Sequence, residues 1–92
     1  MDSVITERVV KIVNPLGMHA RPAALFVKLA TTFASEIEVG NDAMMVNGKS
    51  IMGVMMLAAE QGSSIRIRAT GSDSPQAVDA LADLVGKGFG ES

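Results

Sequence analysis

The chain passes from a loop into a helix in the stretch Asn14-Pro15-Leu16-Gly17-Met18-His19-Ala20-Arg21-Pro22-Ala23-Ala24, and this passage decides the fold. Proline is favoured in the first turn of a helix, because its missing N–H would have no intrahelical partner there and its φ is already helical. Pro22 therefore indicates a helix start, and His19, the only histidine of the chain, lies just before it. The free N–H groups and the positive dipole end of a helix N-terminus favour a phosphate or another anion.

Hydrophobic periodicity predicts the elements on either side of this stretch. They are expected in the order strand, helix, strand, strand, helix, strand, helix, over residues 4–13, 20–32, 36–39, 44–46, 51–57, 65–70 and 72 onwards. Ser50 is the expected N-cap of the second helix, and Gly86, Gly88 and Gly90 are expected to fray the end of the third. The order β-α-β-β-α-β-α predicts an α+β domain of two layers, with the helices on one face of an antiparallel sheet.

Length and composition limit the class of protein. The 92 residues are expected to form a single domain over residues 1–92. The chain has no cysteine and one histidine, so we expect no disulfide, no metal site and no bound cofactor. A net charge of −2 and 3% aromatic residues argue against nucleic-acid binding. No apolar run approaches the ~20 residues of a membrane helix, and the N-terminus lacks the features of a signal peptide, so a cytoplasmic location is expected.

The neighbours of His19 favour a reactive role for this side chain. A histidine near a helix start often serves only as a capping or packing residue. Here Arg21 adds a fixed positive charge that can bind phosphate oxygens in a bidentate manner. Gly17 allows the backbone to approach a ligand closely. We therefore expect His19 to accept a phosphoryl group that Arg21 then holds.

Two motifs together resemble the HPr family, the histidine-containing phosphocarriers of the bacterial phosphoenolpyruvate-dependent phosphotransferase system. They are Asn-x-Leu-Gly-Met followed by His-Ala-Arg-Pro-Ala, and, downstream, Gly48-Lys49-Ser50-Ile51-Met52-Gly53-Val54-Met55-Met56-Leu57. The resemblance covers essentially the whole chain. It implies an open-faced β-sandwich, with a four-stranded antiparallel sheet in the order 1-4-2-3 and three helices on one face.

The resemblance also implies roles for individual residues. His19 would accept a phosphoryl group on Nδ1 from Enzyme I and pass it to an Enzyme IIA-type acceptor. Arg21 would stabilise the phosphoryl group, together with the backbone N–H groups of Ala20 and Arg21. The protein would act as a monomer and as a carrier rather than an enzyme. A partner interface is implied for Ala24, Leu25, Lys28, Ile51, Met52 and Met55.

Two interpretations of the role of Ser50 stay open. As an N-cap it needs no further explanation. Its segment also resembles the regulatory site that HPr kinase/phosphorylase phosphorylates, where the added charge would oppose a docking partner. Met56 and Leu57 are assigned to the core, although several family members carry serine where this chain has Met56.

Other functions remain as alternatives. The chain resembles both the sugar-transport carriers and the nitrogen-related regulatory carriers of the family. A regulatory interaction module of the same fold that does not relay phosphate is a further alternative, against which His19 argues because relatives of that kind lack the active histidine. A hydrolase is disfavoured, because no second reactive group is expected near His19. Arg66 and Arg68 are interpreted as a solvated strand face.

Overall fold

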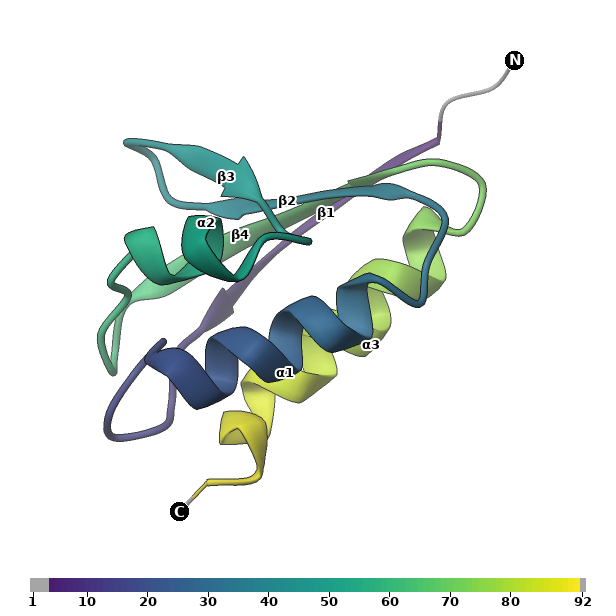
Figure 1. Ribbon diagram of the computed structural model, residues 1–92. Coiled ribbons are helices and arrows are strands. Elements are labelled where there is room, and N and C mark those ends of the chain that lie inside the picture. Colours follow the sequence, from purple (N-terminus) through teal and green to yellow (C-terminus); the bar gives the residue numbers. More distant parts are fainter. Residues whose placement is uncertain (1–3, 92) are drawn as a thin grey trace.

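The computed structural model describes residues 4–91 and has the expected two layers, with three α-helices covering one face of an antiparallel sheet (Figure 1). The ends of the predicted domain, residues 1–3 and 92, lie outside the described residues. The elements in chain order are β1 (Ile5–Lys11), α1 (Ala20–Ala30), β2 (Glu36–Gly40), β3 (Met45–Asn47), α2 (Ile51–Met56), β4 (Ser64–Thr70), α3 (Ser74–Gly86) and the 3₁₀ turn η1 (Gly88–Gly90). This order confirms the predicted fold class.

The sheet has the strand order β1-β4-β2-β3, and every neighbouring pair is antiparallel. Alternation along β4 sets its two faces: Ile65 and Ile67 are buried, whereas Arg66 and Arg68 lie on the opposite, solvated face. Arg68 forms ion pairs there with Glu38 at 3.0 Å on one neighbouring strand and Glu7 at 3.8 Å on the other. The solvated strand face is therefore confirmed, with its charges paired across strands.

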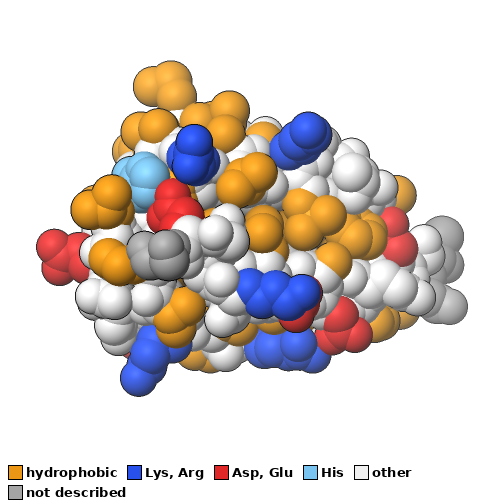
Figure 2. Space-filling model, turned by 90° about the horizontal axis from the view of Figure 1, so that it is seen from below, with side chains coloured by type: hydrophobic (Ala, Val, Ile, Leu, Met, Phe, Trp, Pro, Cys, Tyr) orange, Lys and Arg blue, Asp and Glu red, His pale blue; other side chains and the backbone are white. Residues whose placement is uncertain are grey.

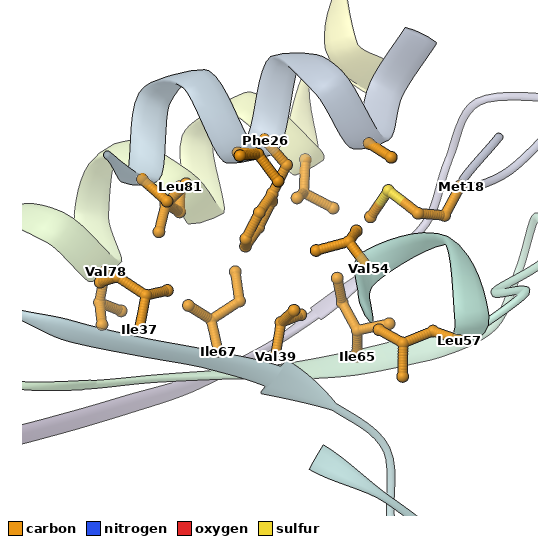
Figure 3. Packing of buried hydrophobic residues seen from close by; sticks show 14 of the residues in the cluster. Met18, Phe26, Ile37, Val39, Val54, Leu57, Ile65, Ile67, Val78 and Leu81 are labelled. Atoms are coloured by element: carbon orange, nitrogen blue, oxygen red, sulfur yellow. The ribbon is translucent and has the colours of Figure 1, made fainter. Parts of the chain in front are cut away.

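The core fills the space between the sheet and the helices (Figure 3). Both layers contribute its fully buried large side chains, among them Ile12, Phe26, Val39, Val54, Ile65, Ile67, Val78, Leu81 and Val85. Phe26 lies at the centre of the buried face of α1, and replacing such a residue by alanine costs about 3–5 kcal/mol. This core fixes α1, and with it the loop that carries His19.

The second helix corrects one prediction about the core. Leu57 is buried as expected, but the assignment of Met56 to the core is wrong, because its side chain is 66% exposed. A helix of six residues presents only one face inward, and Val54 with Leu57, three positions on, occupies that face. Met56 lies between them in sequence and points to solvent.

The C-terminal glycines do not fray the third helix, so that prediction is also wrong. Gly88, Phe89 and Gly90 form the turn η1, in which all three residues have positive φ (66°, 58° and 75°). The glycines adopt this conformation without strain, and burial of Phe89 holds the turn against the core. The chain therefore turns back toward the start of α1.

The start of α3 is attached to the loop before β2. Asp73 accepts hydrogen bonds from the Ser35 hydroxyl and from the backbone N–H groups of Ala34 and Ser35. These bonds, that of the Ser35 hydroxyl above all, lower the pKa of Asp73 below its ordinary value of 3.8. Gly71 lies directly against Ser35, where a Cβ would come within 2.5 Å of its hydroxyl oxygen.

Candidate functional site

His19 is the N-cap of α1 and ends the loop that follows β1. Its backbone is extended (φ −87°, ψ −169°), and its side chain makes no capping hydrogen bond. Gly17 has φ +68° and lies so close to Ala59 that a Cβ would stand 2.3 Å from the Ala59 carbonyl oxygen. Met18 is buried, and its N–H donates to the same carbonyl at 2.8 Å. The imidazole is thus held at the surface by a loop packed against the segment that follows α2.

The first turn of α1 presents its N–H groups beside this imidazole. Ala20 and Arg21 are the first two helical residues, whose N–H groups have no carbonyl partner within a helix. Pro22 follows as the third helical residue and has no N–H. Two backbone donors therefore remain at the helix end, where the dipole favours negative charge.

A carboxylate that the sequence analysis missed completes the site. Glu91 lies against the imidazole, with Oε2 at 3.1 Å and Oε1 at 3.2 Å from His19 Nε2. The turn η1 delivers this side chain from the other end of the chain. The only sequence signal of this chain reversal is the pair of glycines on either side of Phe89, just before Glu91. That signal does not reveal that the Glu91 carboxylate contacts His19.

Asn14 fixes the position of Glu91. The Asn14 side chain is 1% exposed, and its Nδ2 donates to Glu91 Oε1 at 3.0 Å and to the Gly17 carbonyl at 2.8 Å. Burial raises the pKa of Glu91, but the hydrogen bonds from Asn14 and His19 and the attraction of His19 and Arg21 outweigh it, so that the net pKa lies below the ordinary value of 4.5. Glu91 is therefore ionised at neutral pH.

The contact with Glu91 determines which imidazole nitrogen can react. An ionised carboxylate only accepts hydrogen bonds, so the bond to His19 requires a proton on Nε2. In a neutral ring the lone pair available for attack is then on Nδ1. The geometry thus favours Nδ1 as the nucleophilic atom.

Arg21 borders an open hollow next to this site. Its side chain is exposed and forms no ion pair with any carboxylate among residues 4–91. The hollow measures about 580 Å³ and is lined by Pro15, Leu16, Arg21, Leu25, Phe89, Gly90 and Glu91. Figure 2 shows the single histidine at the surface, with a carboxylate and a basic side chain beside it and hydrophobic side chains around them. A phosphoryl group on His19 would find both charge and space here.

Ser50 occupies the N-cap position that the sequence predicted for α2. Its Oγ accepts a hydrogen bond from the Gly53 N–H at 3.1 Å, and its side chain is half-buried. This bond confirms the interpretation of Ser50 as an N-cap. A regulatory phosphorylation there stays a prediction.

The residues expected at the partner interface lie on two helices that contact each other, α1 and α2. All of them are exposed: Ala24, Leu25 and Lys28 on α1, and Ile51, Met52 and Met55 on α2. Met56 and Leu16 are also exposed, at 66% and 75%. We call Leu25, Ile51, Met52, Met55 and Met56 the apolar surface.

The fold and the site define a class of protein: small α+β domains that present a half-buried histidine, backed by a carboxylate, at a helix N-terminus. A family model described as "PTS HPr component phosphorylation site" matches residues 6–87. The phosphocarrier protein HPr of Neisseria meningitidis is 46% identical over 82 residues, which cover 89% of this chain and 92% of that protein. The HPr-like protein Crh of Halalkalibacterium halodurans is 43% identical over 83 residues, or 90% of this chain and 99% of its own.

A solved structure of the same family also matches the chain. The crystal structure of HPr-C-His from Thermoanaerobacter tengcongensis matches with a TM-score of 0.90 and 47% identity, and the match covers 95% of this chain and 98% of that one. The chain therefore belongs to the HPr family. It is a phosphocarrier of the phosphotransferase relay, and not itself an enzyme, which confirms the resemblance noted in the sequence. No helix among residues 4–91 has the length and hydrophobicity needed to cross a membrane.

Proposed function

We propose that His19 accepts the phosphoryl group of phosphorylated Enzyme I on Nδ1 and passes it to an Enzyme IIA-type acceptor. The observation that carries this proposal is the contact of His19 Nε2 with the Glu91 carboxylate at 3.1 Å. It fixes the proton on Nε2 and leaves the Nδ1 lone pair free at the start of α1.

The proposed transfer is an in-line displacement at phosphorus. The Nδ1 lone pair forms the new N–P bond while the bond to the donor breaks and its electron pair returns to the donor. Because the transition state is loose, catalysis depends on positioning and charge more than on acid–base groups. In this proposal the free N–H groups of Ala20 and Arg21 at the start of α1, together with the Arg21 guanidinium, stabilise the phosphoryl oxygens.

Glu91 has a second part in this proposal. Attack through Nδ1 leaves a positive charge on a ring that still carries its Nε2 proton. The ionised carboxylate, held by Asn14, lies at hydrogen-bond distance from that proton and stabilises the charge. Glu91 and Asn14 are thus positioning residues, which act through His19.

We further propose that the exposed residues of α1 and α2 dock the partners in turn. The apolar contact comes from Leu25, Ile51, Met52 and Met55. Ala24 is a small exposed residue on α1, and Lys28 supplies charge. Flexible methionine side chains suit a surface that must fit more than one acceptor. The protein acts in this scheme as a single domain and a monomer.

Ser50 is proposed as a regulatory phosphorylation site for HPr kinase/phosphorylase. A phosphate on Oγ would stand at the start of α2 and add a charge of about −1.5 to −2 next to Ile51 and Met52. That charge would oppose docking of an apolar partner surface. The carrier serves either sugar uptake or nitrogen-related regulation. The Enzyme IIA-type acceptor that takes the phosphoryl group determines which of the two it is.

The test is incubation with Enzyme I and phosphoenolpyruvate labelled in its phosphate. We expect one label per chain that is acid-labile and alkali-stable, as phosphohistidine is, and no label in His19→Ala. Acid-stable label, or label that survives the substitution, would overturn the proposal. A chain that takes up no label, although its circular dichroism shows it folded, would favour a non-relaying interaction module instead.

A further inference from the structure

Three methionines of α2 expose their thioethers to solvent. The exposed fractions are 76% for Met52, 42% for Met55 and 66% for Met56, whereas Met18 is only 4% exposed and packs in the core near Val54 (Figure 3). The helix has no acidic or basic residue over its whole length, Ile51–Met56. Any partner that covers α2 therefore contacts an uncharged surface made largely of methionine.

Exposed thioethers undergo a defined covalent reaction. With hydrogen peroxide, the sulfur lone pair takes up one peroxide oxygen, the O–O bond breaks, and the second oxygen leaves as water. The sulfur is oxidised by two electrons to the sulfoxide, and the peroxide is reduced. A dithiol-dependent sulfoxide reductase reverses the step, because two thiols become a disulfide and the sulfoxide oxygen leaves as water.

We propose that Met52, Met55 and Met56 form a reversible oxidation site that controls docking at the apolar surface. This inference rests on the proposed function, since it regulates the same partner interface. A sulfoxide is polar and a strong hydrogen-bond acceptor, so covering it with an apolar partner leaves that oxygen without a donor. Oxidation would thus weaken docking while the chemistry at His19 is left intact.

The fold is built to tolerate this modification. α2 is attached to the core through Val54, followed by Leu57, and its start is capped by Ser50. None of the three methionines takes part in these attachments, and Met18, whose oxidation would disrupt the core, is protected by burial. The exposed thioethers of the apolar surface are therefore distinct from the buried thioether of Met18, which packs in the core.

The experiment compares the chain before and after treatment with hydrogen peroxide. Peptide mass spectrometry locates the sulfoxides, and thermal unfolding followed by circular dichroism reports the fold. The initial rate of phosphoryl transfer from phosphorylated Enzyme I is measured over a range of Enzyme I concentrations. Each sample is then treated with a methionine sulfoxide reductase and dithiothreitol, and the rate is measured again.

Two variants separate the three positions from the other methionines. Met52→Leu/Met55→Leu/Met56→Leu keeps an apolar surface that peroxide cannot oxidise. Met44→Leu/Met45→Leu removes the methionines at the β2–β3 hairpin and is the matched control. The quantity compared is the ratio of treated to untreated kcat/KM for each chain, so differences between the untreated variants cancel.

We expect the ratio to fall to about one tenth in the natural sequence and in the hairpin variant, through a higher KM for Enzyme I, and to recover with the reductase. In the triple variant it should stay near one. A ratio near one despite sulfoxides at all three positions, or an equal fall in the triple variant, would overturn the inference. Oxidation of Met18 with loss of the fold would do the same. An untreated chain that accepts no phosphate would instead overturn the proposed function itself.

Discussion

Glu91 and His19 are 72 positions apart in the chain, yet the Glu91 carboxylate lies 3.1 Å from His19 Nε2. The last turn of the structure brings them together, because Gly88, Phe89 and Gly90 all adopt positive φ and reverse the chain after α3. A carboxylate at Nε2 selects the neutral tautomer whose Nδ1 is free to attack phosphorus.

Replacing this carboxylate should slow phosphorylation without removing the acceptor. In Glu91→Gln the side-chain amide can donate or accept, so the preference for a proton on Nε2 weakens and the charge of the phosphorylated ring loses its partner. We expect the rate of phosphoryl uptake from phosphorylated Enzyme I to fall about tenfold.

The matched control is Glu36→Gln, an exposed carboxylate on β2. The ring tautomer, followed by ¹⁵N NMR of the imidazole, should shift toward a proton on Nδ1 in Glu91→Gln and stay unchanged in Glu36→Gln. Equal rates and equal tautomer populations in the two variants would show that Glu91 has no positioning role.

Asn14→Ala should weaken both the fold and the site. The buried amide of Asn14 joins the Gly17 carbonyl to Glu91, and alanine leaves both of these groups without that donor. The loss of buried hydrogen bonds predicts a decrease in the free energy of unfolding of about 1–3 kcal/mol, measured by urea denaturation. Gln76→Ala, at an exposed position on α3, is the control and should change this free energy little. Stability equal to that of the natural chain would refute the network.

Arg21→Ala should impair transfer and leave stability almost unchanged. The guanidinium is exposed and has no ion-pair partner among residues 4–91, so its removal costs the fold little, whereas the phosphoryl oxygens lose a charged donor. We expect transfer to slow at least about tenfold and Arg21→Lys to restore only part of it, because lysine cannot bind in a bidentate manner. Lys11→Ala, on β1, is the control for loss of one exposed positive charge. A large drop in Tm in Arg21→Ala would assign this residue to the fold instead.

The contact of Asp73 with Ala34 and Ser35 should make stability depend on pH. The Asp73 pKa is lower in the folded chain than its ordinary value of 3.8, so the folded state binds this proton less readily than the unfolded state does. The stabilisation is fully present above pH 3.8 and is lost as pH falls through the lowered folded-state pKa.

The measurement is Tm against pH for the natural chain and for Asp73→Asn. The natural chain should be the more stable one at neutral pH, and the difference should shrink steadily as the pH falls below 3.8. Glu36→Gln, which removes an exposed carboxylate on β2, serves as the comparison. A difference in Tm that does not depend on pH would mean that the Asp73 charge does not contribute.

Local signals were sufficient to predict most of the fold. Pro22 places the start of α1, alternation of Ile65 and Ile67 with arginines identifies β4, and Ser50 caps α2 as expected. The strand order needs more than local signals, because the pairing of β4 with both β1 and β2 joins segments far apart in the chain. The resemblance to a known family provided it.

Prediction failed where a residue's role depends on tertiary neighbours. Met56 follows a helical pattern of apolar residues, but a helix as short as α2 has room for only one inward face. Glu91 follows Gly88 and Gly90, whose local pattern predicts only a frayed end of α3. Only the burial of Phe89 and the backbone of η1 bring its carboxylate to His19.

The proposal that His19 carries the phosphoryl group on Nδ1 is tested most directly by NMR of the chain labelled with ¹⁵N in histidine and phosphorylated by Enzyme I and phosphoenolpyruvate. We expect coupling of phosphorus to His19 Nδ1, with the proton still on Nε2. Coupling of phosphorus to Nε2, or phosphate on another residue, would contradict it.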